Sequence, residues 1–108
     1  MRYMLLICGD ETAAEHADEG CGGWTEEMQA SGVLVGGGGL HPPSDATTVR
    51  VREDAVLLTD GPFAETKEIL GGYYLIDVAD LDAALGWAAK MPNIEYGSVE
   101  VRPVVVFD

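Results

Sequence analysis

The stretch ILGGYYLIDVADLDAALGWAAK (residues 69–90) joins a predicted strand to a predicted helix and sets the fold class. Its first half, Ile69–Val78, has apolar residues at both odd and even positions, so that Tyr73 and Tyr74 point to opposite faces. This pattern is typical of a strand covered on both sides. Asp80 is a typical N-cap residue, and apolar residues at helical spacing after it are expected to form the buried face, namely Leu81, Ala84, Leu85 and Ala88. The stretch therefore predicts a strand, a tight connection and a helix.

Outward from this stretch, hydrophobic periodicity and turn residues predict one α+β domain covering residues 1–108. Strands are expected at residues 2–8, 33–35, 47–52, 55–59, 69–78 and 99–107, and helices at residues 24–31 and 80–90. The acidic, glycine-punctuated residues 9–23 are expected to form a loop. The order β-α-β, hairpin, β-α-β predicts a ferredoxin-like sandwich, with two helices packed on one face of an antiparallel sheet.

The second face of this sheet predicts a partner. Apolar neighbours that point to opposite sides of a strand are Leu5–Leu6, Tyr73–Tyr74 and Val104–Val105. Two short helices cover only one face, and a monomer rarely leaves a few hundred Å² of apolar sheet in water. Because burial contributes about 25 cal/mol per Å², we expect a homodimer formed face to face through the sheets, with a pocket between each sheet and its helices.

The charge excludes several function classes. Nineteen acidic residues against six basic ones give a net charge of −13, which repels nucleic-acid backbones and anionic membrane surfaces. No apolar run approaches the roughly 18–20 residues that cross a bilayer. The apolar run Tyr3–Cys8 is followed by Asp10 and Glu11, where a signal peptide has small cleavage-site residues. We therefore expect an acidic cytoplasmic protein without nucleic-acid or membrane partners.

The cysteine, histidine and glycine residues predict no metal, cofactor or phosphate site. Cys8 and Cys21 are too few for a disulfide framework, and with His16 and His41 they lack every familiar metal-ligand spacing. The run Gly36–Gly39 is not followed by the lysine of a phosphate loop, and two prolines enforce extended backbone after it. A bent or bulged strand, with another group packed closely against its backbone, is expected instead.

Five blocks of the sequence agree in order and spacing with a known family. They are GVLVGGGGLHPP (32–43), TTVRV (47–51), TDGPFAETKEILGGYYLIDV (59–78), DLDAALGWAAKMP (80–92) and GSVEVRPV (97–104). Together they resemble the YCII-related proteins, and more narrowly the branch named for its Asp-Gly-Pro-Phe motif. The resemblance implies a dimeric ferredoxin-like fold of the α/β-barrel type. It also implies a His–Asp pair at a small pocket in some members, and an association with extracytoplasmic-function sigma factors in others.

The candidate catalytic pair is Asp60 and His41. Asp60 matches the motif aspartate, and His41 belongs to the Gly-Leu-His-Pro-Pro block. A carboxylate beside an imidazole orients it for general acid–base work. The alternative for Asp60 is a turn residue that accepts backbone amides, and the alternative for His41 is a solvent-exposed residue ahead of two prolines.

The candidate substrate-binding residues are three aromatic residues suited to lining a cavity and one arginine suited to binding an anionic group. They are Trp24, Arg50, Phe63 and Tyr73. The alternatives are core packing for the aromatic residues and a cross-strand salt bridge for Arg50.

Two functions remain open at this point. The first is a cofactor-free enzyme that acts on a small organic substrate by proton transfer. The second is a non-catalytic ligand-binding or accessory module linked to transcriptional regulation through a sigma factor. The expected partners are a second copy of the chain, a small-molecule ligand and, for the second function, a sigma factor.

Overall fold

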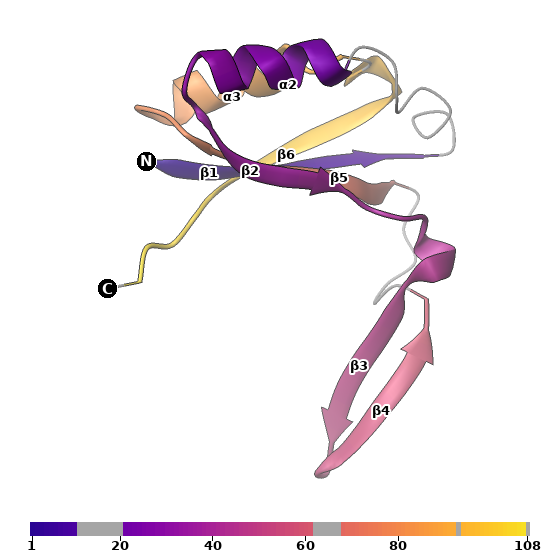
Figure 1. Ribbon diagram of the computed structural model, residues 1–108. Coiled ribbons are helices and arrows are strands. Elements are labelled where there is room, and N and C mark those ends of the chain that lie inside the picture. The colour runs from indigo at the N-terminus through magenta and orange to yellow at the C-terminus, as the bar shows by residue number, and fades with distance from the viewer. Residues whose placement is uncertain (11–20, 62–67, 93, 108) are drawn as a thin grey trace.

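The computed structural model describes residues 1–10, 21–61, 68–92 and 94–107 of the 108-residue chain. Its main element is an antiparallel sheet with strand order β2-β5-β1-β6. These strands are β1 (Arg2–Gly9), β2 (Leu34–Gly39), β5 (Ile69–Asp77) and β6 (Gly97–Pro103). Both α-helices of the described residues lie on one face of this sheet (Figure 1). The predicted ferredoxin-like α+β fold is confirmed.

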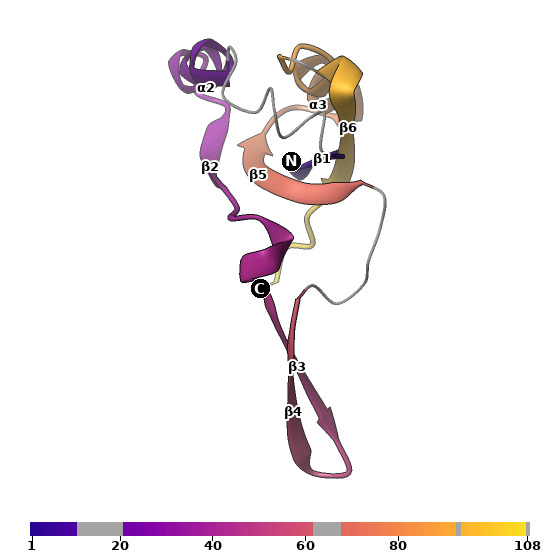
Figure 2. The ribbon, with the colours of Figure 1, turned by 90° about the vertical axis from the view of Figure 1, so that its right-hand side faces the viewer.

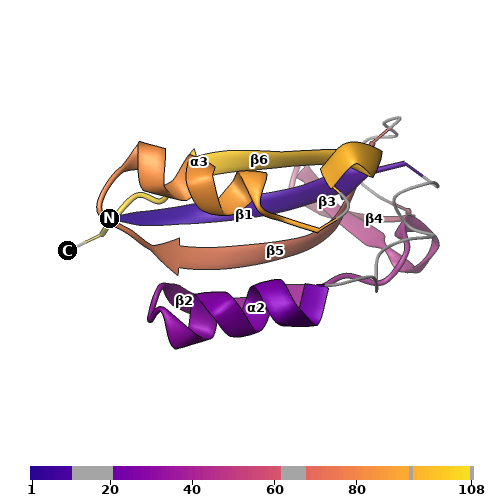
Figure 3. The same cartoon turned by 90° about the horizontal axis from the view of Figure 1, so that it is seen from above.

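The helices are α2 (Cys21–Ala30) and α3 (Leu81–Ala89). Seen from the helix side, α2 lies along β2, and α3 lies over β1 and β6 (Figure 3). Short 3-10 helices, η1 (Pro43–Asp45) and η2 (Ile94–Tyr96), precede β3 and β6. The buried core between the helices and the sheet consists of Tyr3, Leu5, Trp24, Met28, Ile76, Val78, Ala84 and Ala88.

Helix α2 begins at Cys21, so the predicted loop over residues 9–23 is wrong at residues 21–23, whereas its residues 11–20 lie outside the described residues. Trp24 and Met28, one turn apart, are 4% and 0% exposed. Their packing on the sheet outweighs the roughly 1 kcal/mol that each glycine costs within a helix. The predicted end is confirmed. Gly32 has φ of +74°, and Val33 N donates to the Met28 carbonyl oxygen at 3.1 Å, as in a Schellman motif.

Helix α3 has the predicted cap but a different buried face. Asp80 Oδ1 accepts a hydrogen bond from Ala83 N at 2.9 Å. Ala84 and Ala88 are buried as expected, whereas Leu81 and Leu85, predicted to join them, are exposed. The small alanine side chains let the helix approach the sheet closely, which turns the two leucines outward.

The glycine run forms β2 and bends, as predicted, with a register shift between Leu34 and Gly36. A Cβ added at Gly37 would lie 2.6 Å from the Tyr73 carbonyl oxygen and 2.8 Å from Cδ1 of Tyr74. A Cβ at Gly38 would lie 3.5 Å from the Tyr73 hydroxyl oxygen. The group packed against the glycine backbone is therefore the neighbouring strand β5, with one tyrosine ring on each face of the sheet.

The predicted hairpin forms a sheet of its own. Strands β3 (Thr47–Arg52) and β4 (Ala55–Asp60) pair in register and extend away from the body on the side opposite the helices (Figures 1 and 2). The two-residue turn between them has φ of 51° at Glu53 and 65° at Asp54, as in a type I′ turn. Val49 and Val51 lie on one face of β3 and Arg50 and Arg52 on the other, and across the strands Val49 pairs with Leu58 and Arg50 with Leu57.

Strand β6 ends at Pro103 rather than at residue 107, so its predicted length is wrong. Pro103 lies opposite Tyr3, and Val104 N donates to the Arg2 carbonyl oxygen at 2.9 Å. Its partner strand β1 begins at Arg2, so the ladder has no backbone to continue on. The remaining residues Val105, Val106 and Phe107 are exposed.

Candidate functional site

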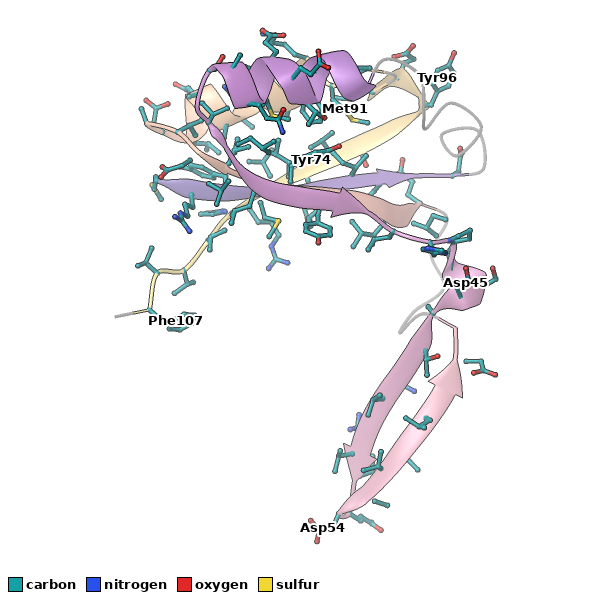
Figure 4. All side chains as sticks on the ribbon, viewed as in Figure 1. Asp45, Asp54, Tyr74, Met91, Tyr96 and Phe107 are labelled. Carbon is teal, nitrogen blue, oxygen red and sulfur yellow. The ribbon has the colours of Figure 1, made fainter. Side chains whose placement is uncertain are left out.

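The structure places His41 beside a carboxylate that the sequence analysis did not single out. His41 Nδ1 lies 3.2 Å from Oδ2 of Asp45. Both residues belong to the segment that joins β2 to the hairpin, and Asp45 lies where the hairpin meets the body (Figure 4). The sequence feature that could have identified Asp45 is the spacing in His-Pro-Pro-Ser-Asp, because a single turn of helix brings residues four apart close together.

Local backbone structure holds this pair. Leu40 N donates to the Gly71 carbonyl oxygen at 2.9 Å, which ties the start of the segment to the edge of β5. Two prolines with restricted φ follow His41, and Asp45 N then donates to the Pro42 carbonyl oxygen at 2.9 Å. The turn of η1 therefore orients the carboxylate toward the imidazole.

Asp60 lies at the base of the hairpin, where it pairs with Thr47, and its side chain is exposed. The base is closed by its neighbour Gly61. Gly61 N donates to the Ala46 carbonyl oxygen at 2.6 Å, and the Thr48 hydroxyl donates to the Gly61 carbonyl oxygen at 2.8 Å. Gly61 has φ of +103°, a conformation that favours glycine. The motif thus fixes the hairpin base through Gly61, and the hydrogen bond recorded for the His41 imidazole goes to Asp45 rather than to Asp60.

The predicted substrate-binding residues do not converge on one place. Trp24 is in the core, where its ring packs edge-on against Tyr74 with centroids 5.1 Å apart. Its indole NH donates to the Trp87 carbonyl oxygen at 3.2 Å and so joins the two helices. Tyr73 lies on the opposite, helix-free face of the sheet, Arg50 lies on the hairpin, and Phe63 lies outside the described residues.

The region between the helices and the sheet, where the sequence placed a pocket, contains closely packed side chains. Leu5, Met28 and Ile76 are fully buried there. Tyr74, labelled in Figure 4, lies between the sheet and the helices and packs, partly buried, against this cluster. Side chains that remain open to a ligand are found on the helix-free side of the sheet and around the hairpin base.

On that helix-free face, Cys8 lies in a local acidic environment. Partial burial raises the pKa of its thiol, and the negative charges of Glu100 and Glu68 raise it further. Ser98, which pairs with Cys8 across the strands, donates a hydrogen bond from its hydroxyl to Glu68 Oε2 at 2.9 Å. These surroundings keep the thiol protonated at neutral pH, which is the opposite of what a nucleophilic cysteine needs.

Within the described ranges, no three or more histidine, cysteine, aspartate or glutamate side chains are grouped so as to hold a metal ion. Of the helices in the described part of the chain, none is long and apolar enough to span a bilayer.

Comparison with known proteins places this geometry in context. A family model described as the YCII-related domain matches residues 1–108. An uncharacterized protein of Rhizobium meliloti (strain 1021) is 47% identical to the chain over 70 residues. That match covers 63% of this chain and 56% of the relative, so the matched region spans just over half of the relative's length.

Proposed function

The chain belongs to the YCII-related family, and we propose that it is a cofactor-free acid–base catalyst of a small organic substrate. His41 is the group that moves the proton, and Asp45 is the residue that orients it. The observation that carries this proposal is the 3.2 Å contact between His41 Nδ1 and Asp45 Oδ2.

The chemistry of the pair follows from this contact. A carboxylate that accepts the Nδ1 proton in a hydrogen bond selects the tautomer with a free lone pair on Nε2. Nε2 then removes a proton from the substrate, and Asp45 stabilises the imidazolium that forms. A positioned general base of this kind contributes about 10²- to 10⁴-fold to a rate.

The substrate class is narrowed by charge and by acidity. With a net charge of −13, the protein repels polyanions and favours neutral or weakly charged molecules. A single imidazole removes only a moderately acidic proton, such as one on the carbon next to a carbonyl group. Small ketones and 1,3-dicarbonyl compounds meet both requirements. The same charge supports our expectation of a protein without nucleic-acid partners.

Proton exchange into deuterium oxide tests the proposal without knowledge of the full reaction. A panel of small ketones and 1,3-dicarbonyl compounds is incubated with the protein in D₂O, and loss of the α-proton signal is followed by NMR. We expect His41→Gln to abolish the catalysed exchange, and Asp45→Asn to reduce it by about 10- to 100-fold, since the imidazole loses its orientation. Asp54→Asn, at the exposed tip of the hairpin, is the matched control and should exchange as fast as the parent.

Asp60→Asn decides between the two carboxylates. If exchange depends on Asp60 and not on Asp45, the pair proposed from the sequence is the functional one. If no member of the panel exchanges faster with the parent protein than in buffer alone, the catalytic proposal is wrong.

A non-catalytic accessory module is the second candidate function, and one observation favours it. The His41 side chain is 88% exposed, whereas catalytic bases usually lie in sites that partly exclude water. In this role the domain binds a protein such as an extracytoplasmic-function sigma factor. Titration of a fluorescently labelled sigma factor of this class with the purified protein tests it, and anisotropy should rise to saturation with the parent and with His41→Gln alike.

A further inference from the structure

The four-stranded sheet ends at β6, and this strand presents backbone groups on its outer side. Val104 N donates to the Arg2 carbonyl oxygen, and β6 pairs with β1 without a register shift. Successive residues of an antiparallel strand turn their backbone groups to opposite sides. The N–H and C=O groups of Val99 and Val101 therefore point away from β1. Because β6 is last in the sheet order, no strand in the described part of the chain pairs with these groups.

Helix α3 places apolar side chains beside this outer edge. The helix contacts β6 and lies over β1 and β6 (Figure 3). The ammonium group of Lys90 bonds to Glu27 of α2, which identifies the flank of α3 that faces α2. Leu81 and Leu85, one turn apart, lie on the other flank, above β6. They are 47% and 45% exposed, so apolar surface remains open there.

The strand residues with outward backbone groups have their side chains on the helix side of the sheet. Val99 and Val101 pack, partly buried, against the core beneath the helices. Their exposed portions therefore adjoin the two leucines of α3. The resulting surface, the edge site, consists of Leu81, Leu85, Val99 and Val101. It combines backbone groups that can form hydrogen bonds with an apolar surface directly beside them.

The opposite edge of the sheet, at β2, lacks this combination. Helix α2 lies along β2 (Figure 3), and none of the large apolar side chains that are exposed in the described residues belongs to α2. Strand β2 is also irregular, with a register shift between Leu34 and Gly36. A regular strand edge beside apolar side-chain sites is the arrangement to which extended peptides add.

We propose that the edge site binds an extended segment of a partner protein, which adds to the sheet as a further strand beside β6. The backbone of the segment forms hydrogen bonds with Val99 and Val101. Because alternate side chains of a strand point to one face, every second side chain of the segment lies against Leu81 and Leu85. The segment therefore has apolar residues at alternate positions.

Charge indicates what the remaining positions carry. The charged side chains of β6, Glu100 and Arg102, balance each other. Asp82 on α3 and Glu95 just before β6 are both exposed. The surroundings of the edge site are thus negative, in a chain whose net charge is −13. Complementary potentials favour a segment that contains lysine or arginine.

The same argument disfavours a second copy of this chain as the source of the segment. The chain has an exposed apolar segment of its own, Val105–Phe107. That segment contains no basic residue and is followed by Asp108. Its charge is the wrong one for the edge site, so a partner protein is favoured.

Selection from a library of short random peptides tests the site without a known partner. The phage-displayed library is panned on the immobilised full-length protein, and enriched peptides are synthesised with a fluorescent label. We expect the enriched sequences to alternate apolar residues and to contain lysine or arginine, and we expect anisotropy to rise to saturation. Failure to enrich such peptides would overturn the inference.

Methylation of the peptide backbone tests whether the peptide binds as a strand. Two forms of one selected peptide are made, each with methyl groups on the nitrogens of alternate residues, so that each form lacks the N–H donors of one side. The form methylated on the side facing β6 should bind at least about 100-fold more weakly, because it loses several hydrogen bonds. The other form should bind within about threefold of the parent peptide. Equal binding of the two forms would contradict strand addition.

A matched pair of variants tests the contribution of α3. Leu85→Asp should weaken peptide binding at least about tenfold, because an apolar contact is replaced by a charge. Leu57→Asp, at a leucine of the hairpin that is 46% exposed, should change the dissociation constant by less than about twofold. Circular dichroism confirms that both variants remain folded. Equal dissociation constants for the two variants would overturn the placement at the edge site.

A peptide with the sequence PVVVFD, residues 103–108, tests the second copy. If it displaces the selected peptides more effectively than they displace one another, the site belongs to a second copy and the inference is wrong. The inference does not rest on the acid–base proposal. His41→Gln should bind the selected peptides as tightly as the parent even where it abolishes proton exchange, so the two proposals fail separately.

Discussion

The body of the molecule, meaning the four-stranded sheet and its two helices, and the β3–β4 hairpin carry the same kinds of apolar residue with opposite outcomes. Leu5 in the body is completely buried, whereas Leu58 on the hairpin is 68% exposed. Both lie in strands whose successive side chains point to opposite faces. The comparison shows that alternation defines which face of a strand is apolar, and that only the surrounding chain, or a second chain, covers that face.

The largest expected effect tests how tightly the body is built. A Cβ at Gly97 would overlap the carbonyl oxygen of Cys8 on the neighbouring strand. Gly97→Ala should therefore destabilise the protein by about 4 kcal/mol or more, or prevent folding. Gly39→Ala, in β2 and with no atom within 4 Å of the added carbon, is the control and should change stability by less than about 1 kcal/mol. Urea unfolding followed by circular dichroism measures both, and equal losses would show that β1 and β6 separate easily.

The second prediction compares the body and the hairpin directly. Leu5→Ala should cost about 3 kcal/mol, because it opens a cavity in a fully buried site. Leu58→Ala should lower the free energy of unfolding by less than about 0.5 kcal/mol, because this side chain is exposed. The free energies are measured at several protein concentrations and extrapolated to infinite dilution, so that they describe the single chain. A loss at Leu58 as large as that at Leu5 in this limit would mean that the hairpin packs on its own body.

The third prediction concerns the stability of the hairpin itself. Type I′ turns strongly favour glycine, and Asp54 adopts φ of 65° there. Asp54→Gly should stabilise the hairpin by about 0.5 kcal/mol. Amide hydrogen exchange should slow on β3 and β4, and the body should exchange as before. Slower exchange throughout the body would contradict the separation of the two regions.

The smallest effect is the pH dependence contributed by Cys8. Its pKa is raised in the folded state, so the folded protein holds the thiol proton more tightly than the unfolded chain. The resulting stability is fully present below the ordinary thiol pKa of about 8.5 and is lost as pH rises through the folded-state pKa. In a Cys21→Ser background, alkylation by iodoacetamide at pH 8.5 should be slower for the folded protein than for the protein in urea. Glu100→Gln should narrow that difference, and no change on removing this carboxylate would leave burial and Glu68 as the causes.

Local rules predicted much of the body. The end of α2 at Gly32 and the cap of α3 at Asp80 depend on residues within a turn or two of each other, so the sequence was sufficient for both. The start of α2 and the outward turn of Leu81 and Leu85 depend on packing against the sheet. Propensity and periodicity do not contain that information.

The candidate site could be predicted only in part. His41 was found as a candidate, but its partner was assigned to Asp60 on the strength of a motif. The turn of η1 brings Asp45 to the imidazole instead, at 3.2 Å. Trp24 was selected as an aromatic residue for a cavity, and the packing of two helices made it a core residue whose indole bonds to Trp87. Residue type predicted the chemistry available, whereas a local turn decided the partner of His41 and a tertiary contact decided that of Trp24.

By itself, the sequence determined the order of strands and helices, the apolar character of both sheet faces and a net charge of −13 that repels phosphate backbones, because these depend on residue type and spacing. Only the tertiary structure decided that the hairpin leaves the body and that Leu5, Met28 and Ile76 are fully buried between the helices and the sheet. Those outcomes depend on how segments far apart in the sequence pack against one another, and residue type and spacing do not say which segments come into contact.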